Sequence, residues 1–582
     1  MSASGLRRRT PAAAVVAAFA VIVALGMSAT PSSAAPKPGK GPVKAQTTEI
    51  QILGLNDFHG ALEPPTGSAG RLGPSGTPEF GGAEYLATHV RALRATNPNT
   101  LFVSAGDLIG ATPLTSALFH DEPTIEAFNL MDLDFNGVGN HEFDEGVDEL
   151  LRMQTGGCHP VDGCQDGDGF AGADFEFLAA NVAYKDGGDT IFPPYAIREF
   201  KGVKVGIVGM TTKTTPSIVT PAGISTVDFF DEADSVNALV PVLKEQGVET
   251  IVVLLHEGGN TSTAGNGTGA GADKINECAN PTGALPPIID KMDDAIDVVI
   301  TGHTNWAVNC VLDGKIVTGA GVNGKIVTDI DLTLSRATKD VVSATVNNVP
   351  VSRTVAKAGD MTTLIDKYRT LSAPLANRIV GSMTADITTA STPAGESFAG
   401  DVIADAQLAA TSPATLGGSV VAFMNPGGIR NSGLTFASAP AGEAPGQVTY
   451  GELFSVQPFN NVLTVVTCTG AQVEAILEQQ FTGGNGILQV SNGFTYTYDT
   501  TRPAGDKIDS STIKIGGTAI VGSQPYRVTT NNFLVTGGDN FTAFRACTNP
   551  LGGDIDLDAL VHYFEANSPV APGPRNRITR LN

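Results

Sequence analysis

One pattern recurs five times between residues 49 and 305: a short apolar segment of strand length ends in polar side chains next to small residues. Between these segments lie stretches such as 81–96 and 231–246, in which apolar residues repeat with helical spacing. Strands that alternate with helices predict a layered α/β domain with polar side chains gathered at one edge of its sheets. The five segments are EIQILGLNDFHG (49–60), TLFVSAGDLIG (100–110), FNGVGNHEFD (135–144), ETIVVLLHEGG (249–259) and AIDVVITGHTN (295–305).

The pattern changes near residue 360. A chain of 582 residues is too long for one ordinary core, and a short amphipathic helix at 361–371 is suited to join two domains. The mixture of elements beyond it predicts an α+β second domain. These elements are helices at 399–410 and 470–480 and strands near 420–424, 461–466, 494–498 and 526–530.

The N-terminus has the order of a secretory signal peptide. Arg7, Arg8 and Arg9 precede an apolar run at 12–27, and small residues at 32–35 offer a cleavage site near Ala34. The alternative is a membrane anchor, but the run is short and polar residues follow it at once. We therefore expect a signal peptide at 1–35, a flexible linker at 36–47, and a secreted protein that is not inserted in a membrane after cleavage.

Composition matters here through its charge. Without the leader, 33 basic residues face 59 acidic ones, a net charge of −26. Such acidity disfavours binding to nucleic-acid backbones and to anionic membranes. A phosphorylated substrate would then need local cations, either metal ions or a placed arginine.

Six cysteines in an exported chain predict three disulfides. The six allow 15 pairings, of which proximity along the chain favours Cys158–Cys164, Cys278–Cys310 and Cys468–Cys547. No C-x-x-C pair exists, which argues against zinc binding by these cysteines.

The polar clusters after the apolar segments carry carboxylates, imidazoles and amides, and they include four of the eight histidines. Such mixed ligands suit divalent metals such as Zn²⁺, Mn²⁺ or Fe²⁺. A single D-x-H is weak, because a lone histidine is usually structural, but five clusters in order indicate a metal centre. Two metals need a bridging ligand and a separate ligand set on either side.

The series D-x-H, G-D, G-N-H-E-x-D, H and G-H-x-N resembles the calcineurin-like metallophosphoesterase family. Over about 48–572 the chain resembles the secreted bacterial 5′-nucleotidases, a group that includes UDP-sugar hydrolases and 2′,3′-cyclic phosphodiesterases. The resemblance implies an αββα metallophosphoesterase sandwich at 48–355 with two divalent metal ions at its edge. It also implies a helical linker at 356–379 and an α+β substrate-binding domain at 380–572, with rotation of the domains about the linker.

Residue by residue, the resemblance implies two ligand sets that share a bridging carboxylate. Asp57, His59 and Asn305 match ligands of the first metal, Asp107 matches the bridge, and Asn140, His256 and His303 match ligands of the second metal. His141, oriented by Asp144, matches a pair that stabilises the phosphoryl transition state. The alternative for this pair is a helix cap, and we interpret Glu142 and Glu257 as supporting or solvated carboxylates.

In the second domain, Asn425-Pro-Gly-Gly-Ile-Arg430 follows an apolar strand. Glycine allows close approach of the backbone to a ligand, and arginine offers a fork for phosphate; the alternative is a turn with a surface arginine. The motif resembles the 5′-nucleotidase substrate loop, which implies substrate contacts from Asn425, Gly428 and Arg430. It further implies a nucleobase between Phe459 and Phe533 and a sugar held by Asp539. Residues 392–401 depart from the family, because they contain no arginine.

These features predict a secreted phosphohydrolase with two divalent metals that removes the 5′-phosphate of nucleotides. The same site allows a 2′,3′-cyclic phosphodiesterase or a UDP-sugar hydrolase, and a nuclease is disfavoured by the net charge. A function of another class remains as an alternative: an exported protein that binds metal or nucleoside and has no catalytic activity. The sequence leaves the metal identity, the preferred base and the oligomeric state open.

Overall fold

The computed structural model describes residues 46–582 apart from 74–76, 220–222, 261–273, 279–280, 440–441, 460 and 483–485. The predicted signal peptide and nearly all of the predicted linker lie outside the described residues. Within the described residues, no helix combines the length and the apolar character that a membrane span requires.

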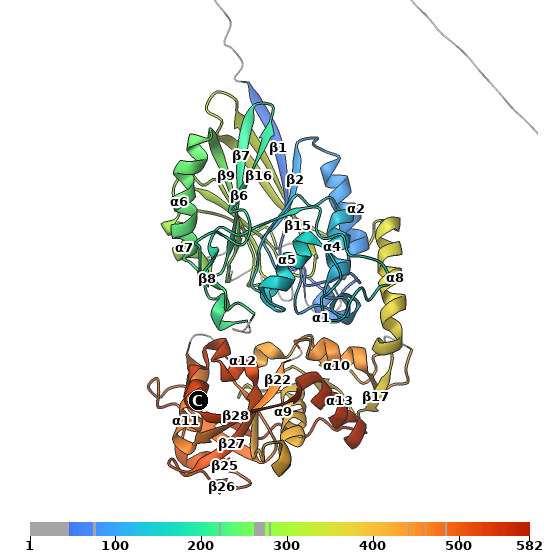
Figure 1. Ribbon diagram of the computed structural model, residues 1–582, viewed down its shortest axis with the longest axis vertical. Helices are drawn as coiled ribbons and strands as arrows, with labels where there is room; N and C mark the ends of the chain where they lie inside the picture. The colour runs from blue at the N-terminus through green and yellow to red at the C-terminus, as the bar shows by residue number, and fades with distance from the viewer. Residues whose placement is uncertain are drawn as a thin grey trace, which may run out of the picture. The chain divides into compact units, whose positions relative to one another are not determined.

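Two six-stranded sheets form the first half of the chain (Figure 1). In the first sheet β1 to β4 run parallel, and in the second β7, β9, β12 and β14 do, with antiparallel strands at the edges. The first has the order β16 (Val341–Pro350), β15 (Ile326–Ser335), β1 (Thr47–Leu55), β2 (Thr100–Ser104), β3 (Phe135–Gly137), β4 (Glu176–Leu178). The second has the order β13 (Ala307–Leu312), β14 (Lys315–Ala320), β12 (Val298–Thr301), β9 (Val248–His256), β7 (Val203–Thr211), β6 (Tyr195–Phe200).

Apolar side chains fill the space between the sheets and both outer faces. Ile52, Val252 and Ile300 belong to the core between the sheets. Figure 1 shows α6 (Glu232–Glu245) and α7 (Leu285–Lys291) on one side of the sheets, and α2 (Ala83–Arg94), α4 (Glu122–Leu130) and α5 (Val147–Thr155) on the other. The predicted αββα sandwich is therefore confirmed. Short elements complete this half: α1 (Gly67–Gly70), α3 (Leu114–Ala117), β5 (Val182–Tyr184), β8 (Val227–Phe229), β10 (Gly259–Asn260) and β11 (Thr282–Gly283).

The strand ends explain where the polar clusters lie. The carboxyl ends of neighbouring parallel strands meet at one edge of a sheet. Asp57, Asp107 and Asn140 follow β1, β2 and β3 of the first sheet, while His256 ends β9 and His303 follows β12 in the second. The fold thus brings the five predicted clusters to one edge, as the sequence pattern predicts.

The second half is a mixed α+β structure, as predicted. It holds a five-stranded sheet, β23 (Gln489–Val490), β19 (Val421–Met424), β27 (Pro525–Asn531), β22 (Val462–Thr469), β28 (Thr548–Ile555), and a four-stranded sheet, β26 (Thr518–Ala519), β25 (Lys514–Ile515), β24 (Phe494–Tyr498), β29 (Ile578–Arg580). Two-stranded pairs join β17 (Ile379–Ser382) to β21 (Gln447–Thr449) and β18 (Ile387–Thr388) to β20 (Gly433–Leu434). Its helices are α9 (Phe398–Thr411), α10 (Tyr450–Val456), α11 (Gly470–Glu478), α12 (Asn532–Val535) and α13 (Asp556–Asn567).

Helix α8 (Gly359–Ala376) connects the two halves and is longer than the predicted 361–371. Its buried side chains Met361 and Ile365 belong to the core of the first half, next to α2 and α4. Tyr368 is also buried, and its hydroxyl donates to Glu126 and to Asp166 at 3.0 Å each. The linker helix is thus anchored on the first half.

The three disulfides that proximity favours are all present. They join Cys158 to Cys164, Cys278 to Cys310 and Cys468 to Cys547. The first closes a short loop, and Asp166 just beyond it accepts from Lys367 Nζ at 2.8 Å. The sequence predicts a disulfide-tied surface loop here rather than a calcium site. In the structure, Asp166 beside this loop contacts the linker helix through Lys367.

Candidate active site

The predicted ligands of the first half converge on the carboxylate of Asp107. Asp107 Oδ2 lies 3.1 Å from His256 Nε2 and 3.7 Å from His59 Nε2. His59 Nε2 is also 3.9 Å from Asp57 Oδ1. A carboxylate with imidazoles on either side has the position that a bridging ligand requires.

Asn140 joins the same cluster from the end of β3. Its side-chain oxygen lies 3.1 Å from His256 Nε2 and 2.9 Å from His303 Nδ1. Asp107, His256 and His303 each present one ligand atom within a common distance of 4.8 Å, and His59, Asp107 and His141 do the same. The predicted ligands are therefore brought together. Asn305 lines a cavity with His59, Asp107, Asn140 and His303.

The backbone at these positions is unusual. Asp57, His59, Asp107, His303 and Asn305 all have positive φ angles, between 48° and 69°. Non-glycine residues rarely adopt this conformation, and it clusters at functional sites. Neighbouring glycines allow the close approach: a Cβ on Gly106 would lie 2.6 Å from the Gly139 nitrogen and 2.7 Å from His256 Nδ1. A Cβ on Gly139 would overlap Asp107 Oδ1.

Charge is paired inside the cluster. Burial by itself would raise the pKa of Asp107, but His256, His141 and His59 outweigh it and hold the pKa below its usual value. Burial would likewise lower the pKa of His256, which Asp107 raises instead. For Asp57 and His59 burial prevails, so the pKa of Asp57 is raised and that of His59 is lowered. The cluster thus holds ionisable groups that the apolar sandwich would not tolerate without a partner charge.

The cluster fits divalent cations. Asp57 Oδ1 and Asn305 Oδ1 are buried and have no hydrogen-bond partner among the described residues. Buried polar atoms are almost always paired, so two orphaned oxygens beside three imidazoles indicate a missing ligand. Carboxylate, imidazole and amide donors are those that divalent Zn, Mn or Fe accepts.

His141 lies beside the cluster with the predicted partner. Its Nδ1 is 2.7 Å from Asp144 Oδ2, and its backbone nitrogen donates to Asp107 Oδ1 at 2.9 Å. Burial would lower the pKa of His141, but Asp144 and Asp107 outweigh it and raise the pKa. Nη2 of Arg430, from the second half, lies 3.2 Å from His141 Nε2. The two groups are therefore direct neighbours.

Glu142, expected from the sequence to be a supporting or solvated carboxylate, and Asn56, to which the sequence assigned no role, both support the cluster. Glu142 is buried and accepts hydrogen bonds from the backbone nitrogens of Asp107 and Leu108 at 2.9 Å and of Gly139 at 2.8 Å. Asn56 donates to Asp57 Oδ2 at 2.5 Å and accepts from the Ala320 nitrogen. The sequence signal for both roles was proximity to a predicted ligand: Glu142 lies two residues after Asn140, and Asn56 directly precedes Asp57. Glu257 is also a buried supporting carboxylate, since it accepts from Thr212 Oγ1 at 2.8 Å.

A cavity of about 310 Å³ joins the cluster to the predicted substrate residues. Asp107, Asn140, His141 and His303 line it from the first half. The lining residues from the second half include every predicted one: Asn425, Gly428, Arg430, Phe459, Phe533 and Asp539. The sequence missed Asn461 and Asn531, which line it as well.

Hydrogen bonds and ring contacts order the wall from the second half. Asn425 donates to Asp539 Oδ2 at 2.7 Å and accepts from Asn531 at 3.1 Å. The Phe459 ring stacks on His141 with centroids 5.9 Å apart, and the Arg430 guanidinium lies 5.1 Å from the Phe459 centroid. The aromatic wall thus directly adjoins His141 and Arg430.

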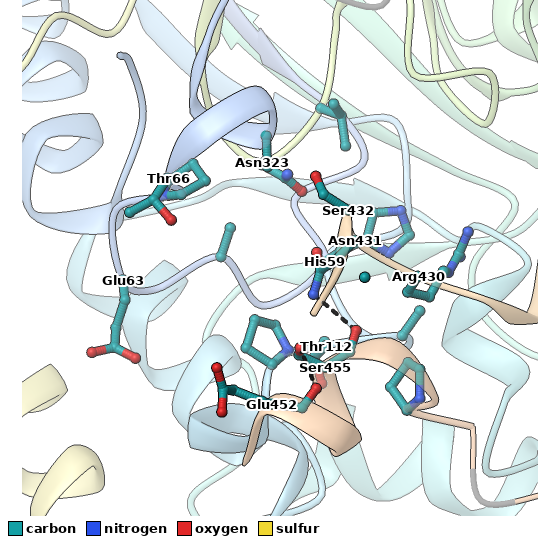
Figure 2. A pocket seen from close by; sticks show the side chains of 18 of the residues that line it. His59, Glu63, Thr66, Thr112, Asn323, Arg430, Asn431, Ser432, Glu452 and Ser455 are labelled. Carbon is teal, nitrogen blue, oxygen red and sulfur yellow. Dashed lines mark hydrogen bonds between the residues drawn. The ribbon is translucent and has the colours of Figure 1, made fainter. Parts of the chain in front are cut away.

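A second cavity, of about 470 Å³, opens on the other side of the cluster (Figure 2). It shares His59, Asn305 and Arg430 with the first cavity. The rest of its lining is mostly polar, with Glu63, Thr66, Thr112, Asn323, Asn431, Ser432, Glu452 and Ser455 labelled in Figure 2. Space for a ligand therefore exists on both sides of the cluster.

Comparisons with known proteins agree with this geometry. Residues 50–306 match the calcineurin-like phosphoesterase family, and residues 378–546 match the 5′-nucleotidase C-terminal domain. The chain is 33% identical to the cell wall protein Lmo0130 of Listeria monocytogenes, over 90% of this chain and 67% of that protein. It is 32% identical to the endonuclease YhcR of Bacillus subtilis over 91% of this chain, but it spans only 41% of that longer protein.

A solved structure shows the same fold. The crystal structure of a 5′-nucleotidase precursor from Thermus thermophilus superposes with a TM-score of 0.72 at 24% identity, covering 92% of this chain and all of that one. The two family matches follow one another along the chain in the order of the two structural halves. The chain belongs to the 5′-nucleotidase family of hydrolases, in which a calcineurin-like phosphoesterase region that uses divalent metals precedes the 5′-nucleotidase C-terminal domain.

Proposed function

We propose that the chain is a secreted phosphohydrolase that removes the 5′-phosphate of nucleotides. One observation carries this proposal: a single cavity of about 310 Å³ is lined both by the cluster of candidate metal ligands and by Phe459, Phe533 and Asp539. A phosphate at the cluster would leave its nucleoside against the aromatic wall. Aromatic walls stack on any base, so this arrangement selects nucleotides as a class.

Two divalent cations would be held by the residues of the cluster. Asp57, His59 and Asn305 would hold one, Asn140, His256 and His303 the other, and Asp107 would bridge them, as the sequence predicts. Such cations supply Lewis-acid polarisation of a phosphate oxygen and lower the pKa of water. Zn²⁺, Mn²⁺ and Fe²⁺ are all compatible with this donor set.

The protein's own side chains then act on the phosphate. Arg430 is a fork donor that binds two phosphate oxygens, and its guanidinium is held in place over Phe459. Asp144 fixes the His141 ring by accepting from Nδ1, which leaves Nε2 directed at the cavity. Positioned donors of this kind stabilise the charge that develops in the transition state.

The stretch without arginine supports a monophosphate substrate. Glu396 and Asp401 in this stretch are buried, and both face Arg577, which donates its backbone nitrogen to Glu396 and lies 3.6 Å from Asp401. The segment therefore supplies no cation to the cavity, whose described lining contains one arginine, Arg430. One arginine and the cluster suffice for a single phosphate.

A second candidate is hydrolysis of a nucleotide sugar or another ester with groups on both sides of the phosphorus. The second cavity favours it, because it adjoins His59 and Arg430 and presents hydroxyls, amides and carboxylates that suit a sugar. The relative named an endonuclease raises a polynucleotide as a third substrate. The net charge of −26 without the leader opposes that substrate.

Phosphate release from a substrate panel separates these candidates. Mature protein, stripped of metal and then supplied with Mn²⁺ or Zn²⁺, would be offered AMP, ADP, ATP, UDP-glucose, 2′,3′-cyclic AMP and bis-p-nitrophenyl phosphate. We expect metal-dependent release, fastest from AMP. Faster cleavage of UDP-glucose would favour the second candidate. No turnover of any substrate despite bound metal would favour a non-catalytic binding protein.

The export and the domain boundaries are part of the same proposal. Three disulfides support an oxidising compartment, and one relative is named a cell wall protein. The proposed domains are 48–355 and 380–572, joined at 356–379. Support comes from the sheets, since the two six-stranded sheets use strands up to Pro350 and the remaining large sheets use strands from Val421 onward.

A further inference from the structure

A second cluster of metal-ligating side chains lies outside the candidate active site. We name it the peripheral cluster: His120, Glu145, His159 and Asp162. His120 Nδ1 is 2.8 Å from Glu145 Oε2, and His120 Nε2 is 3.0 Å from Asp162 Oδ2. His159 Nδ1 lies 3.3 Å from the same Asp162 oxygen. Three separate segments therefore place four ligand groups together.

The geometry is that of a site rather than of scattered ion pairs. His120, Glu145 and His159 each offer one ligand atom, and these atoms all lie within 4.8 Å of one another. The two imidazoles stack, with ring centroids 3.7 Å apart and planes inclined by 14°. Because the lone pairs of imidazole lie in the ring plane, one ring turns when both bind the same ion. Their side chains are only 17% and 15% exposed, whereas those of Glu145 and Asp162 are 46% and 45% exposed. Ordered imidazoles below open carboxylates give an ion an entry path.

Covalent and backbone constraints hold the cluster in place. His159 and Asp162 lie in the loop that the Cys158–Cys164 disulfide closes, and Gly163 donates to the His159 carbonyl at 2.9 Å. His120 has a φ of 50°, the same left-handed conformation as the ligands of the active-site cluster. Donors that are fixed before binding lose less conformational entropy when an ion arrives.

The cluster carries the ligand types of a metal site. Two imidazoles with a carboxylate match the ligand preferences of zinc and related divalent ions.

We propose that the peripheral cluster binds one divalent transition-metal ion, of the Zn²⁺ class, separate from the active-site cations. The ion displaces a proton from one ring nitrogen of His120 to solvent and is held by that nitrogen, His159 and Glu145, whose ligand atoms lie within 4.8 Å of one another. Asp162 faces the other ring nitrogen of His120. The ion would tie the disulfide-closed loop to His120, which precedes Asp121, and to Glu145, which follows Asp144.

These two neighbours link the site to the active-site cluster. Asp121 accepts from the Gly110 nitrogen at 3.0 Å, and the Gly110 carbonyl lies 2.9 Å from His59 Nδ1. A cavity of about 230 Å³ is lined by His120 and Glu145 together with His141 and Asp144. The ion therefore supports the segments that orient His59 and His141, and it touches no substrate.

Metal content per chain tests the proposal. The mature, disulfide-intact protein is stripped with chelator, dialysed against Zn²⁺ and assayed by inductively coupled plasma mass spectrometry. His159→Ala and Glu145→Gln are compared with the wild type. The matched control is His562→Ala, which removes an exposed histidine 3.8 Å from Asp554. Two cluster variants are used because one of them could fold poorly, which circular dichroism reports.

We expect each cluster variant to bind one ion fewer than the wild type, and the control to bind the same number. Substitution with Co²⁺ should give visible absorption bands that His159→Ala lacks in part. Equal metal content in the wild type and both cluster variants would overturn the proposal. Because the readout is a difference of one ion, it is independent of how many ions the active site holds and of whether the proposed nucleotidase reaction occurs.

Discussion

On one side of the 310 Å³ cavity, the ligand groups follow parallel strands of two packed sheets, and Asp57, Asp107 and His256 are fully or almost fully buried. On the other side, the groups stand on loops and short helices: Phe459 follows α10, Phe533 lies in α12, and Asp539 follows it with a φ of 49°. The first side is built on a rigid scaffold and the second on connections between elements.

This difference matches two different tasks. Cations and a transition state need donors fixed to within a fraction of an ångström. Stacking of a base needs an apolar surface and tolerates adjustment. Substitutions on the strand-end side should therefore abolish chemistry, whereas those on the loop side should weaken binding.

The largest effect is expected for Asp107→Asn. The variant loses the charged oxygen that faces His59 and His256, so metal content should fall. Turnover should fall by more than the roughly 10³-fold seen when one charge-stabilising donor is removed. Metal analysis and AMP hydrolysis measure this, with the exposed Asp186→Asn as the control. Retained metal and activity would break the contrast between the two sides.

His141→Ala separates chemistry from metal binding on the same side. Its ring forms a hydrogen bond with Asp144 and is not expected to ligate a cation. We expect normal metal content and a fall of kcat by about 10² to 10³. Asp144→Asn should keep the ring and lose less. An unchanged kcat in His141→Ala would remove the assigned role.

Phe533→Ala tests the loop side. Loss of a stacking ring costs about 1–3 kcal/mol, which corresponds to a KM for AMP raised about 5- to 150-fold, with a smaller change in kcat. Ribose 5-phosphate, which has no base, is the internal control and should be hydrolysed as before. An equal loss with both substrates would mean that Phe533 supports the fold rather than the base.

The smallest effect on turnover is expected for Asp556→Asn. This variant tests how a buried carboxyl on the loop side makes the free energy of unfolding depend on pH. Asp556 begins α13 behind Asn461, and burial raises its pKa to about 7. Unlike Asp107, it has no imidazole partner at hydrogen-bond distance among the described residues. The folded protein therefore holds a proton that the unfolded chain has lost between about pH 4 and 7, so the free energy of unfolding falls as pH rises across this window.

Asp556→Asn should lack this fall, so its stability relative to the wild type should increase from about pH 4.5 to 7.5. Each unit of pKa shift corresponds to about 1.4 kcal/mol, which urea unfolding resolves. The exposed Asp558→Asn on the same helix is the control and should show no trend. A flat difference for Asp556→Asn would mean that this carboxylate is compensated after all.

The sequence predicted the two sides to different degrees, for a physical reason. Apolar strands that end in polar side chains predict a layered α/β domain with Asp57, Asp107 and His256 at one edge of its sheets, because the carboxyl ends of parallel strands meet there. The αββα sandwich itself was implied by the family resemblance. Asn425, Phe459 and Phe533 were assigned only through a family resemblance, since no periodicity places a loop. The role of Glu142 depends on three backbone nitrogens that converge only in the folded chain.

The peripheral cluster shows the same limit more strongly. His120 and His159 lie 39 positions apart and belong to none of the predicted motifs, so the sequence assigned neither a role. Strands β13 to β16 were also not predicted, because in this half only apolar segments that end in polar clusters indicated a strand. In contrast, the disulfide pairing followed correctly from proximity alone.

The glycines that let the strand ends approach have a consequence for how this protein can vary. Gly302 repeats the situation of Gly106 and Gly139, since a Cβ there would lie 2.8 Å from the Ala105 carbonyl and 2.9 Å from His256 Nδ1. Even alanine at any of the three pushes a ligand out of place, and no single second change restores all the contacts. In a deep mutational scan, substitutions at these three glycines should be tolerated as rarely as substitutions of the proposed ligands, although none of the three glycines touches a substrate.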